Sequence, residues 1–155
     1  MHNYIVGLFM SQDTGCPELM FENQVCFPLY SAANAVVRAY RPLLDKLDLT
    51  YLQYMVMMLI WQHQSMSVKD LGEKLTLDSG TLTPLLKRLE GKGLVIRGRS
   101  QQDERVRVIT LTNEGKALKE HAKEVPQTMA CRAGLSSEEA GQLKALCQQL
   151  LSRLG

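Results

Sequence analysis

Three side chains in the N-terminal part of the sequence, Cys26, Tyr30 and Tyr40, have the types and the spacing of a redox site. Tyr30 follows the cysteine by four residues and Tyr40 follows it by fourteen, or about one and four turns of an α-helix. The three residues would therefore lie on roughly one face of one helix. Phenolic hydroxyls can donate hydrogen bonds to a thiolate, and the thiolate is the form of cysteine that attacks peroxides and disulfides.

The same residues could instead be a buried structural cysteine and two amphipathic tyrosines, because free cysteine packs well as a small hydrophobic side chain. The position of Pro28 bears on this choice. Proline is tolerated in the first turn of a helix but not in its interior, so Cys26 is predicted at or near the start of a helix over about residues 24–46. The partial positive charge of a helix N-terminus favours a thiolate there. Pro42 predicts a kink or a restart before Leu43.

The other cysteines do not form a recognisable set. Four cysteines, Cys16, Cys26, Cys131 and Cys147, are too few and too scattered for a disulfide scaffold or a zinc site, so no metal or cofactor is expected. Reduced thiols in a cytoplasmic protein are the expectation. Cys147 lies on the apolar stripe of a C-terminal helix, where packing is the expected role. Cys16 is assigned no role.

The middle of the sequence predicts a winged helix-turn-helix. Two short helices, over residues 67–75 and 79–91, are separated by a tight turn. Ser67 is the expected cap of the first, Asp78 or Ser79 of the second, and Pro84 is expected near the first turn of the second. Two predicted strands follow, over residues 94–97 and 106–111. The polar loop between them, residues 98–105, is the expected wing.

The charge distribution favours a polyanionic partner. Between residues 84 and 110 there are seven basic and three acidic residues, a local net charge of +4, while the rest of the chain carries −2. A positive patch on a nearly neutral body is typical of nucleic-acid binding. The alternative is an ordinary solvated charged face, although such faces mix the two signs more evenly.

The ends of the chain complete the predicted organisation, which is a single domain of mainly α structure with a small β-wing. Residues 1–21 are expected to be an N-terminal extension, for which disorder is one interpretation. The winged helix-turn-helix is expected over about 51–111, between dimerisation helices over about 22–48 and 112–155. A helix interrupted by Pro126 and a last helix with a capping box at Ser136 make up the C-terminal part. We expect no membrane-spanning helix and no secretory signal.

Four segments in order, from about Glu22 onward, resemble the MarR family of dimeric transcriptional regulators. Within that family they look like the organic-hydroperoxide-sensing repressors of the OhrR type. The segments are Glu22–Tyr30, Tyr40–Asp45, Leu77–Arg88 and Asp103–Arg105.

The resemblance implies a homodimeric repressor without enzymatic activity that releases operator DNA when an organic hydroperoxide oxidises Cys26. It implies that Tyr30 and Tyr40 help to hold the thiolate, and that they come from the partner subunit. In the two-cysteine members of the group, a second cysteine forms a disulfide with the sensor of the other subunit. Cys131 lies 105 residues after Cys26 and fits that pattern. Nearby apolar residues would favour organic over hydrogen peroxide: Phe21, Phe27, Leu29 and Met57.

The resemblance also implies how the chain reads double-stranded DNA. The wing residue Arg105 would reach the minor groove, with Asp103 orienting it. The alternative for this pair is a surface ion pair of little energetic value. Helix capping is the alternative role for Ser79 and Thr81. The residues expected to face the major groove or its phosphates are Ser79, Thr81, Thr83, Lys87 and Arg88.

Two other functions are compatible with the sequence. A repressor of the same family could be released by a small apolar or phenolic ligand, with Cys26 incidental, and would then respond under reducing conditions. A thiol peroxidase would turn over peroxide repeatedly with a reductant, but the sequence offers no catalytic architecture beyond the thiol.

Overall fold

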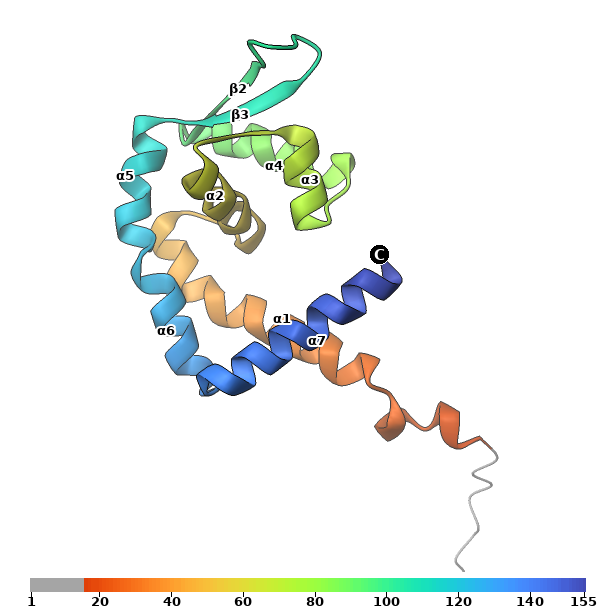
Figure 1. The fold of residues 1–155 in the computed structure, drawn as a ribbon. Helices are drawn as coiled ribbons and strands as arrows, with labels where there is room; N and C mark the ends of the chain where they lie inside the picture. The colour runs from red at the N-terminus through yellow and green to blue at the C-terminus, as the bar shows by residue number, and fades with distance from the viewer. Residues whose placement is uncertain (1–15) are drawn as a thin grey trace, which may run out of the picture. The chain divides into compact units, whose positions relative to one another are not determined.

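The computed structural model describes residues 16–155, which form seven α-helices, three 3-10 helices and three β-strands (Figure 1). The described part of the chain separates into two units, one that ends at Val36 and one that begins at Val37, and each is described by itself. The proposed disorder of the N-terminal extension concerns residues that lie largely outside the described part of the chain.

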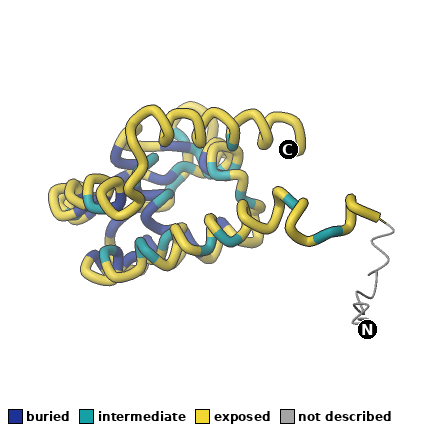
Figure 2. The backbone as a smooth tube through the Cα atoms, turned by 90° about the horizontal axis from the view of Figure 1, so that it is seen from below, coloured by how far each residue is buried: buried dark blue, intermediate teal, exposed yellow. Residues whose placement is uncertain are grey.

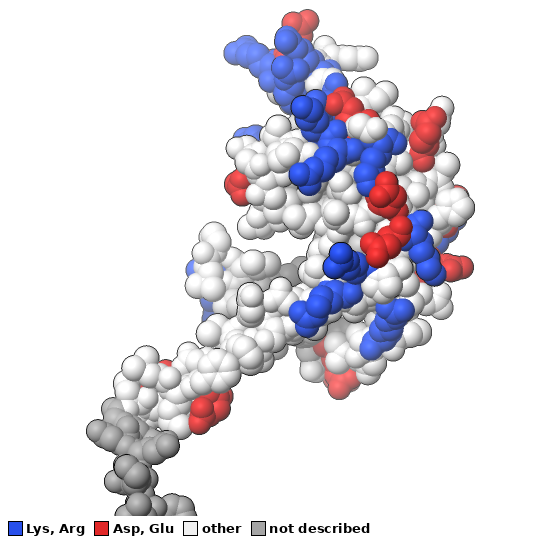
Figure 3. Space-filling model, turned by 180° about the vertical axis from the view of Figure 1, so that it is seen from behind, with Lys and Arg blue, Asp and Glu red and all other residues white. Residues whose placement is uncertain are grey.

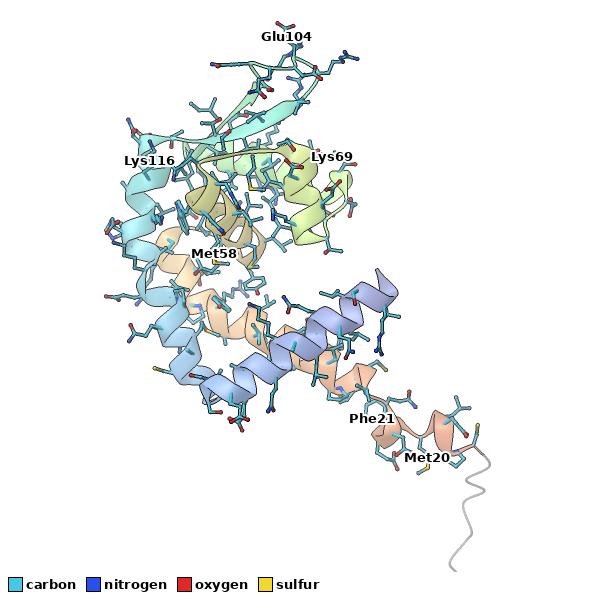
Figure 4. All side chains as sticks on the ribbon, viewed as in Figure 1. Met20, Phe21, Met58, Lys69, Glu104 and Lys116 are labelled. Atoms are coloured by element: carbon cyan, nitrogen blue, oxygen red, sulfur yellow. The ribbon has the colours of Figure 1, made fainter. Side chains whose placement is uncertain are left out.

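Residues 16–36 contain two short 3-10 helices, η1 (Pro17–Leu19) and η2 (Phe21–Asn23), and the first turns of helix α1. Side-chain amides hold the two 3-10 helices together. Asn23 Nδ2 donates to the carbonyl oxygen of Pro17 at 2.9 Å, and Gln24 Nε2 donates to the carbonyl oxygens of Glu18 at 2.6 Å and Met20 at 3.1 Å. The segment before α1 is therefore a folded turn whose side chains include Met20 and Phe21 (Figure 4).

Helix α1 runs without interruption from Cys26 to Leu44 and is followed by the 3-10 helix η3 (Asp45–Leu47). The prediction that Cys26 begins the helix is confirmed. The predicted restart before Leu43 is wrong, because Pro42 lies inside the last turn of α1. Proline cannot donate the hydrogen bond that would go to the carbonyl of Arg38, but both residues are exposed, so water can take its place.

Six further helices belong to residues 37–155. Their starts follow local capping rules. The caps predicted at Ser67 and Ser136 are confirmed, Asp78 and not Ser79 caps α4, and Thr50 caps α2. Thr50 and Ser136 form complete capping boxes. The helices are α2 (Tyr51–His63), α3 (Val68–Leu75), α4 (Ser79–Gly91), α5 (Asn113–Ala122), α6 (Glu124–Ala133) and α7 (Ser137–Leu154).

The prolines of α4 and α6 lie in different turns of their helices. Pro84 lies in the second turn of α4, not near its first turn as predicted, because the Asp78 cap starts the helix at Ser79. The lost hydrogen bond would have gone to the carbonyl of Gly80, which is exposed. Pro126 lies in the first turn of α6, where its missing N–H costs little, and α5 has already ended at Ala122.

Three antiparallel strands form one sheet in the order β1-β3-β2. Strands β2 (Val95–Arg99) and β3 (Arg107–Leu111) form the predicted hairpin, which extends past the helices as a wing (Figure 1). Strand β1 (Ser65–Ser67) was not predicted, because three residues are too short for a periodic signal. Its buried Met66 pairs with Ile109 of β3.

Helix α2 is the centre of the core, since it contacts α3, α4, α5 and the sheet. Tyr54, Met57 and Ile60 of this helix are almost fully buried. Helix α7, in contrast to α2, has no buried residue in the single chain and is largely exposed along its length (Figure 2).

Trp61 joins α2 to the beginning of α5. Its indole Nε1 donates a buried hydrogen bond of 2.7 Å to the carbonyl oxygen of Gly115. A Cβ atom at Gly115 would lie 2.2 Å from the carbonyl oxygen of Leu94 and 2.6 Å from Cδ1 of Leu111. The close approach of α5 to the backbone before β2 therefore requires glycine at this position.

We predict that Gly115→Ala lowers the free energy of unfolding by about 2–3 kcal/mol, because the nearest obstacle is backbone and cannot rotate away. Gly141→Ala is the matched control. Nothing lies within 4 Å of a Cβ atom at Gly141, so alanine there should stabilise its helix by about 0.5–1 kcal/mol. Chemical denaturation measures both changes. Equal stability of Gly115→Ala and the wild type would contradict the close packing at this junction.

Candidate functional site

Cys26 is exposed at the first position of α1 and is flanked by apolar surface. The rings of Phe21 and Phe27 pack against each other with centroids 4.4 Å apart, and both rings remain exposed, as does Leu29. Three of the four predicted apolar neighbours thus belong to the same folded segment as the cysteine. Met57 does not, because it is fully buried in the core of the winged helix.

The two tyrosines of α1 have different surroundings. Tyr30 is 69% exposed, whereas Tyr40 is half-buried against α2, with its ring centroid 5.1 Å from that of Tyr51 and 5.9 Å from that of Tyr54. Burial, together with the neighbouring Tyr51, raises the pKa of Tyr40. Its hydroxyl therefore stays protonated and able to donate a hydrogen bond.

Tyr51 is a further possible partner of the site. Tyr51 is the first residue of α2, and its ring adjoins that of Tyr40 only through the tertiary packing of α2 on α1. Any group that approaches the Tyr40 hydroxyl would also meet this second phenol. Spacing along the chain gives no signal for such a contact.

Cys131 is exposed in the last turn of α6, three residues before Gly134 ends the helix with a φ of 64°. The helix continues past Cys131 to Ala133, so this thiol lies on a helix and not in a connecting segment. Its neighbour Arg132 donates a hydrogen bond of 3.0 Å from Nη1 to the carbonyl oxygen of Ala39 in α1. Movement of Cys131 would therefore involve the end of α6 as a whole.

The remaining cysteines are less suited to a redox role. Cys147 is half-buried on α7, beside a row of exposed leucines, so the expected full burial does not occur within one chain. A partner helix would be needed to cover it. Cys16 is exposed, and its thiol donates a hydrogen bond of 3.2 Å to Oε2 of Glu18.

The exposed face of α4 carries the residues predicted for the major groove. Its buried face consists of Leu82, Leu85, Leu86 and Leu89. Asp78 holds the first turn, since Oδ1 accepts from the backbone N–H of Thr81 and Oδ2 from its hydroxyl, both at 2.9 Å. These bonds lower the pKa of Asp78. The Thr81 hydroxyl thus has a capping role, and the fully free exposed side chains are Ser79, Thr83, Lys87 and Arg88.

Asp103 shapes the tip of the wing around Arg105. Its Oδ1 accepts a hydrogen bond of 2.9 Å from the backbone N–H of Arg105 and lies 3.5 Å from Nε of the same residue. The Arg105 side chain is 94% exposed. The backbone of Arg105 is therefore fixed, while its guanidinium group projects into solvent. The neighbouring Glu104 lies at the tip of the wing (Figure 4).

The positive surface holds fewer unpaired cations than the number of basic residues suggests. Three of the seven cations between residues 84 and 110 lie in ion pairs: Arg97 with Glu90, Lys92 with Asp48 at 2.9 Å, and Arg105 with Asp103 at 3.5 Å. Lys and Arg side chains gather over the wing (Figure 3). The described residues contain no cluster of metal-ligating side chains and no helix long and apolar enough to cross a membrane.

Comparison with known proteins agrees with this arrangement. The family described as transcriptional regulator SarA/Rot matches residues 38–122. The organic hydroperoxide resistance transcriptional regulator of Bacillus subtilis is 47% identical over 136 residues, which cover 88% of this chain and 92% of the relative.

Solved structures give the same result. AbfR of Staphylococcus epidermidis in its reduced form bound to DNA is 34% identical, with a TM-score of 0.72, over 86% of this chain and 93% of that one. The disulfide-formed AbfR is 32% identical, with a TM-score of 0.62, over 84% and 91% of the two chains. A MarR variant from E. coli in complex with operator DNA is 26% identical, with a TM-score of 0.73, over 81% and 92%.

These relatives are DNA-binding regulators and not enzymes, and they share the winged helix that the structure shows. The chain belongs to the MarR family of winged-helix transcriptional regulators, together with the organic hydroperoxide resistance regulator of Bacillus subtilis.

Proposed function

We propose that this chain is a homodimeric repressor that binds operator DNA in its reduced form and releases it when an organic hydroperoxide oxidises Cys26. The observation that carries the proposal is the exposed thiol at the N-terminus of a long helix, beside the apolar pair of Phe21 and Phe27. A regulator of operator DNA would work in the cytoplasm, where thiols are kept reduced.

The geometry of α1 supports a sensor site shared by two subunits. Fourteen residues of an α-helix rise about 21 Å, which is much farther than a thiol and a phenol can bridge. Cys26 and Tyr40 of one continuous helix therefore cannot meet unless they come from different chains. A second copy could bring Tyr40, and Tyr51 packed against it, to the thiolate as hydrogen-bond donors.

The proposed chemistry starts with attack of the Cys26 thiolate on the peroxide. The sulfur takes the terminal oxygen, the O–O bond breaks, and the alkoxide leaves and gains a proton to become an alcohol. Cysteine is thereby oxidised to a sulfenic acid and the peroxide is reduced. The thiol of Cys131 from the partner then attacks this sulfur, which forms a disulfide and releases the oxygen as water.

Disulfide formation would change the positions of the DNA-reading elements. It requires the two Cα atoms within about 7 Å of each other. Since Arg132 ties the end of α6 to α1, a shift of Cys131 would be passed on to both helices. A dimer reads half-sites about 34–36 Å apart, so a change of a few ångströms prevents both recognition helices from docking together. The existence of AbfR in a DNA-bound reduced form and in a disulfide form supports such a cycle.

We propose that α4 enters the major groove with Ser79, Thr81, Thr83, Lys87 and Arg88, while Arg105 enters the minor groove. Asp103 would direct Arg105, because it fixes both the backbone and the Nε of this residue. The exposure of these side chains and the DNA complexes of the relatives support this assignment.

An apolar groove between α2 and the α5–α6 junction favours a second candidate, a repressor released by a small apolar or phenolic ligand. The groove measures about 440 Å³, and its lining includes Tyr54, Met58, Trp61 and Pro126. Release of operator by such a ligand in the presence of excess reductant, with no response to peroxide, would favour this function over the redox one.

We predict that Cys26→Ser binds operator like the wild type but no longer releases it after treatment with cumene hydroperoxide, since the nucleophile is gone. Fluorescence anisotropy of labelled operator measures both properties. Cys147→Ser is the matched control and should respond normally. A Cys26→Ser protein that still dissociates on oxidation would rule out Cys26 as the sensor.

The second prediction concerns the partner of the oxidised thiol. One equivalent of hydroperoxide should give a covalent dimer of the wild type in non-reducing electrophoresis, and none for Cys131→Ser. The variant should stop at the sulfenic acid, which a dimedone probe traps. A covalent dimer that persists in Cys131→Ser, or a mapped disulfide from Cys26 to Cys16 or Cys147, would assign the resolving role elsewhere.

The third prediction tests the wing. Arg105→Ala should weaken operator binding at least tenfold, because a positioned minor-groove arginine is lost. Lys116→Ala, which removes one positive charge from α5, should change affinity much less (Figure 4). Operator titrations at several salt concentrations measure both. Equal affinities of the two variants would contradict a specific role for Arg105.

A further inference from the structure

A groove separates the recognition helix α4 from the β2–β3 hairpin. Its volume is about 430 Å³, and it lies between the two elements that the proposed function assigns to the major and minor grooves. A DNA backbone strand passes between adjacent grooves, so this is where phosphates would lie. The charged and polar side chains that line the groove are Thr83, Glu90, Arg97 and Arg107.

Arg97 of the groove is held by Glu90. Its Nε donates to Oε2 of Glu90 at 2.6 Å and its backbone N–H donates to Oε1 at 3.2 Å. The hydrogen bonds from Arg97 lower the pKa of Glu90, so the carboxylate stays ionised. Both side chains are about one-third exposed, which leaves the pair within reach of a ligand in the groove.

Arg99 and Arg107 of the hairpin differ from Arg97 in that they face each other and not a carboxylate. Arg99 and Arg107 are direct partners in the register of β2 and β3. Like charges directly opposite each other on a hairpin destabilise it. Within residues 16–155, neither of the two has a carboxylate at ion-pair distance. A phosphate between them would relieve the repulsion.

We infer that Glu90 is a specificity-determining residue for DNA binding, because its carboxylate neutralises Arg97 beside the groove and leaves the phosphate contacts to Arg99 and Arg107. The inference rests on the proposed DNA-binding function. Phosphate contacts carry no base information, so an additional free arginine would strengthen binding to every sequence. The pair of Glu90 and Arg97 also fixes the distance between α4 and β2. This distance affects the affinity for operator but not the affinity for random DNA.

The competing explanation is that Glu90 only braces the fold by joining α4 to β2. The two explanations differ in the salt dependence of binding. If Glu90 only joins α4 to β2, its loss weakens binding to all DNA and adds no phosphate contact. A released arginine adds one contact, which changes the slope of log affinity against log salt by about 0.9 and strengthens binding roughly eightfold at 0.1 M salt relative to 1 M.

The test compares Glu90→Gln with the wild type in their reduced forms, on a 30-base-pair operator and on a scrambled duplex, across 0.05–0.3 M salt. We expect Glu90→Gln to bind the scrambled duplex severalfold more tightly, with a slope steeper by about 0.9, and to discriminate less between the two duplexes. Adding Arg97→Gln should return the slope to the wild-type value. Glu120→Gln is the matched control. It also removes a paired carboxylate, but one on α5 that is paired with Lys123, and it should leave the slope unchanged.

An unchanged or shallower slope for Glu90→Gln, or a steeper slope that persists in the Glu90→Gln/Arg97→Gln double variant, would overturn the inference. Tight operator binding by the wild type in the same assay shows that such a failure concerns Glu90 alone. If the wild type itself does not bind operator, the proposed function fails first. Arg97→Gln alone gives an independent check, since an unpaired Glu90 should repel phosphates and weaken binding to the scrambled duplex.

Discussion

The continuity of α1 is the constraint on which the account depends. A helix that is unbroken from Cys26 to Leu44 holds the thiol and the Tyr40 hydroxyl about four turns apart. The Cys26 thiol and the Tyr40 hydroxyl can therefore meet only if they come from different subunits. Pro42 could have relaxed this constraint by breaking the helix, but its position in the last, exposed turn leaves the helix intact. In the proposed sensor, the partner subunit completes the site, so that oxidation of Cys26 would directly change the geometry of the dimer.

The contacts within residues 37–155 provide a route from this helix to the DNA-reading elements. Arg132 joins α6 to the carbonyl of Ala39, and Lys92, at the end of α4, pairs with Asp48 just after η3. The first contact is a hydrogen bond and the second is an ion pair, and an exposed ion pair contributes little to stability. The hydrogen bond from Trp61 to the Gly115 carbonyl and the close approach of Gly115 to Leu94 join α5 to α2 and to the backbone before β2. In the proposed mechanism, these contacts would pass displacements of α1 and α6 on to the winged helix.

Much of the fold could be predicted because its rules are local. Caps at Ser67, Asp78 and Ser136 depend on a side chain that accepts a hydrogen bond from the backbone N–H three residues later, and these predictions are confirmed. The wing and recognition helix follow from periodicity and turn residues. What could not be predicted depends on tertiary contacts. The packing of Tyr51 on Tyr40 and the neutralisation of Arg97 by Glu90 join residues whose meeting no spacing reveals. The short strand β1 exists only because β3 lies beside it. The roles of Cys26, Cys131 and the tyrosines stay predictions.

Mixed dimers test the shared site most directly. One dimer combines a Cys26→Ser subunit with a Tyr40→Phe subunit, and the other combines a subunit carrying both substitutions with a wild-type subunit. The measured quantity is the rate of sulfenic acid formation at the single remaining Cys26. If Tyr40 acts across the dimer, the first mixed dimer keeps one complete site and reacts at the wild-type rate per thiol, while the second reacts slowly. The opposite order of rates would place both groups of the site in one chain and contradict the account.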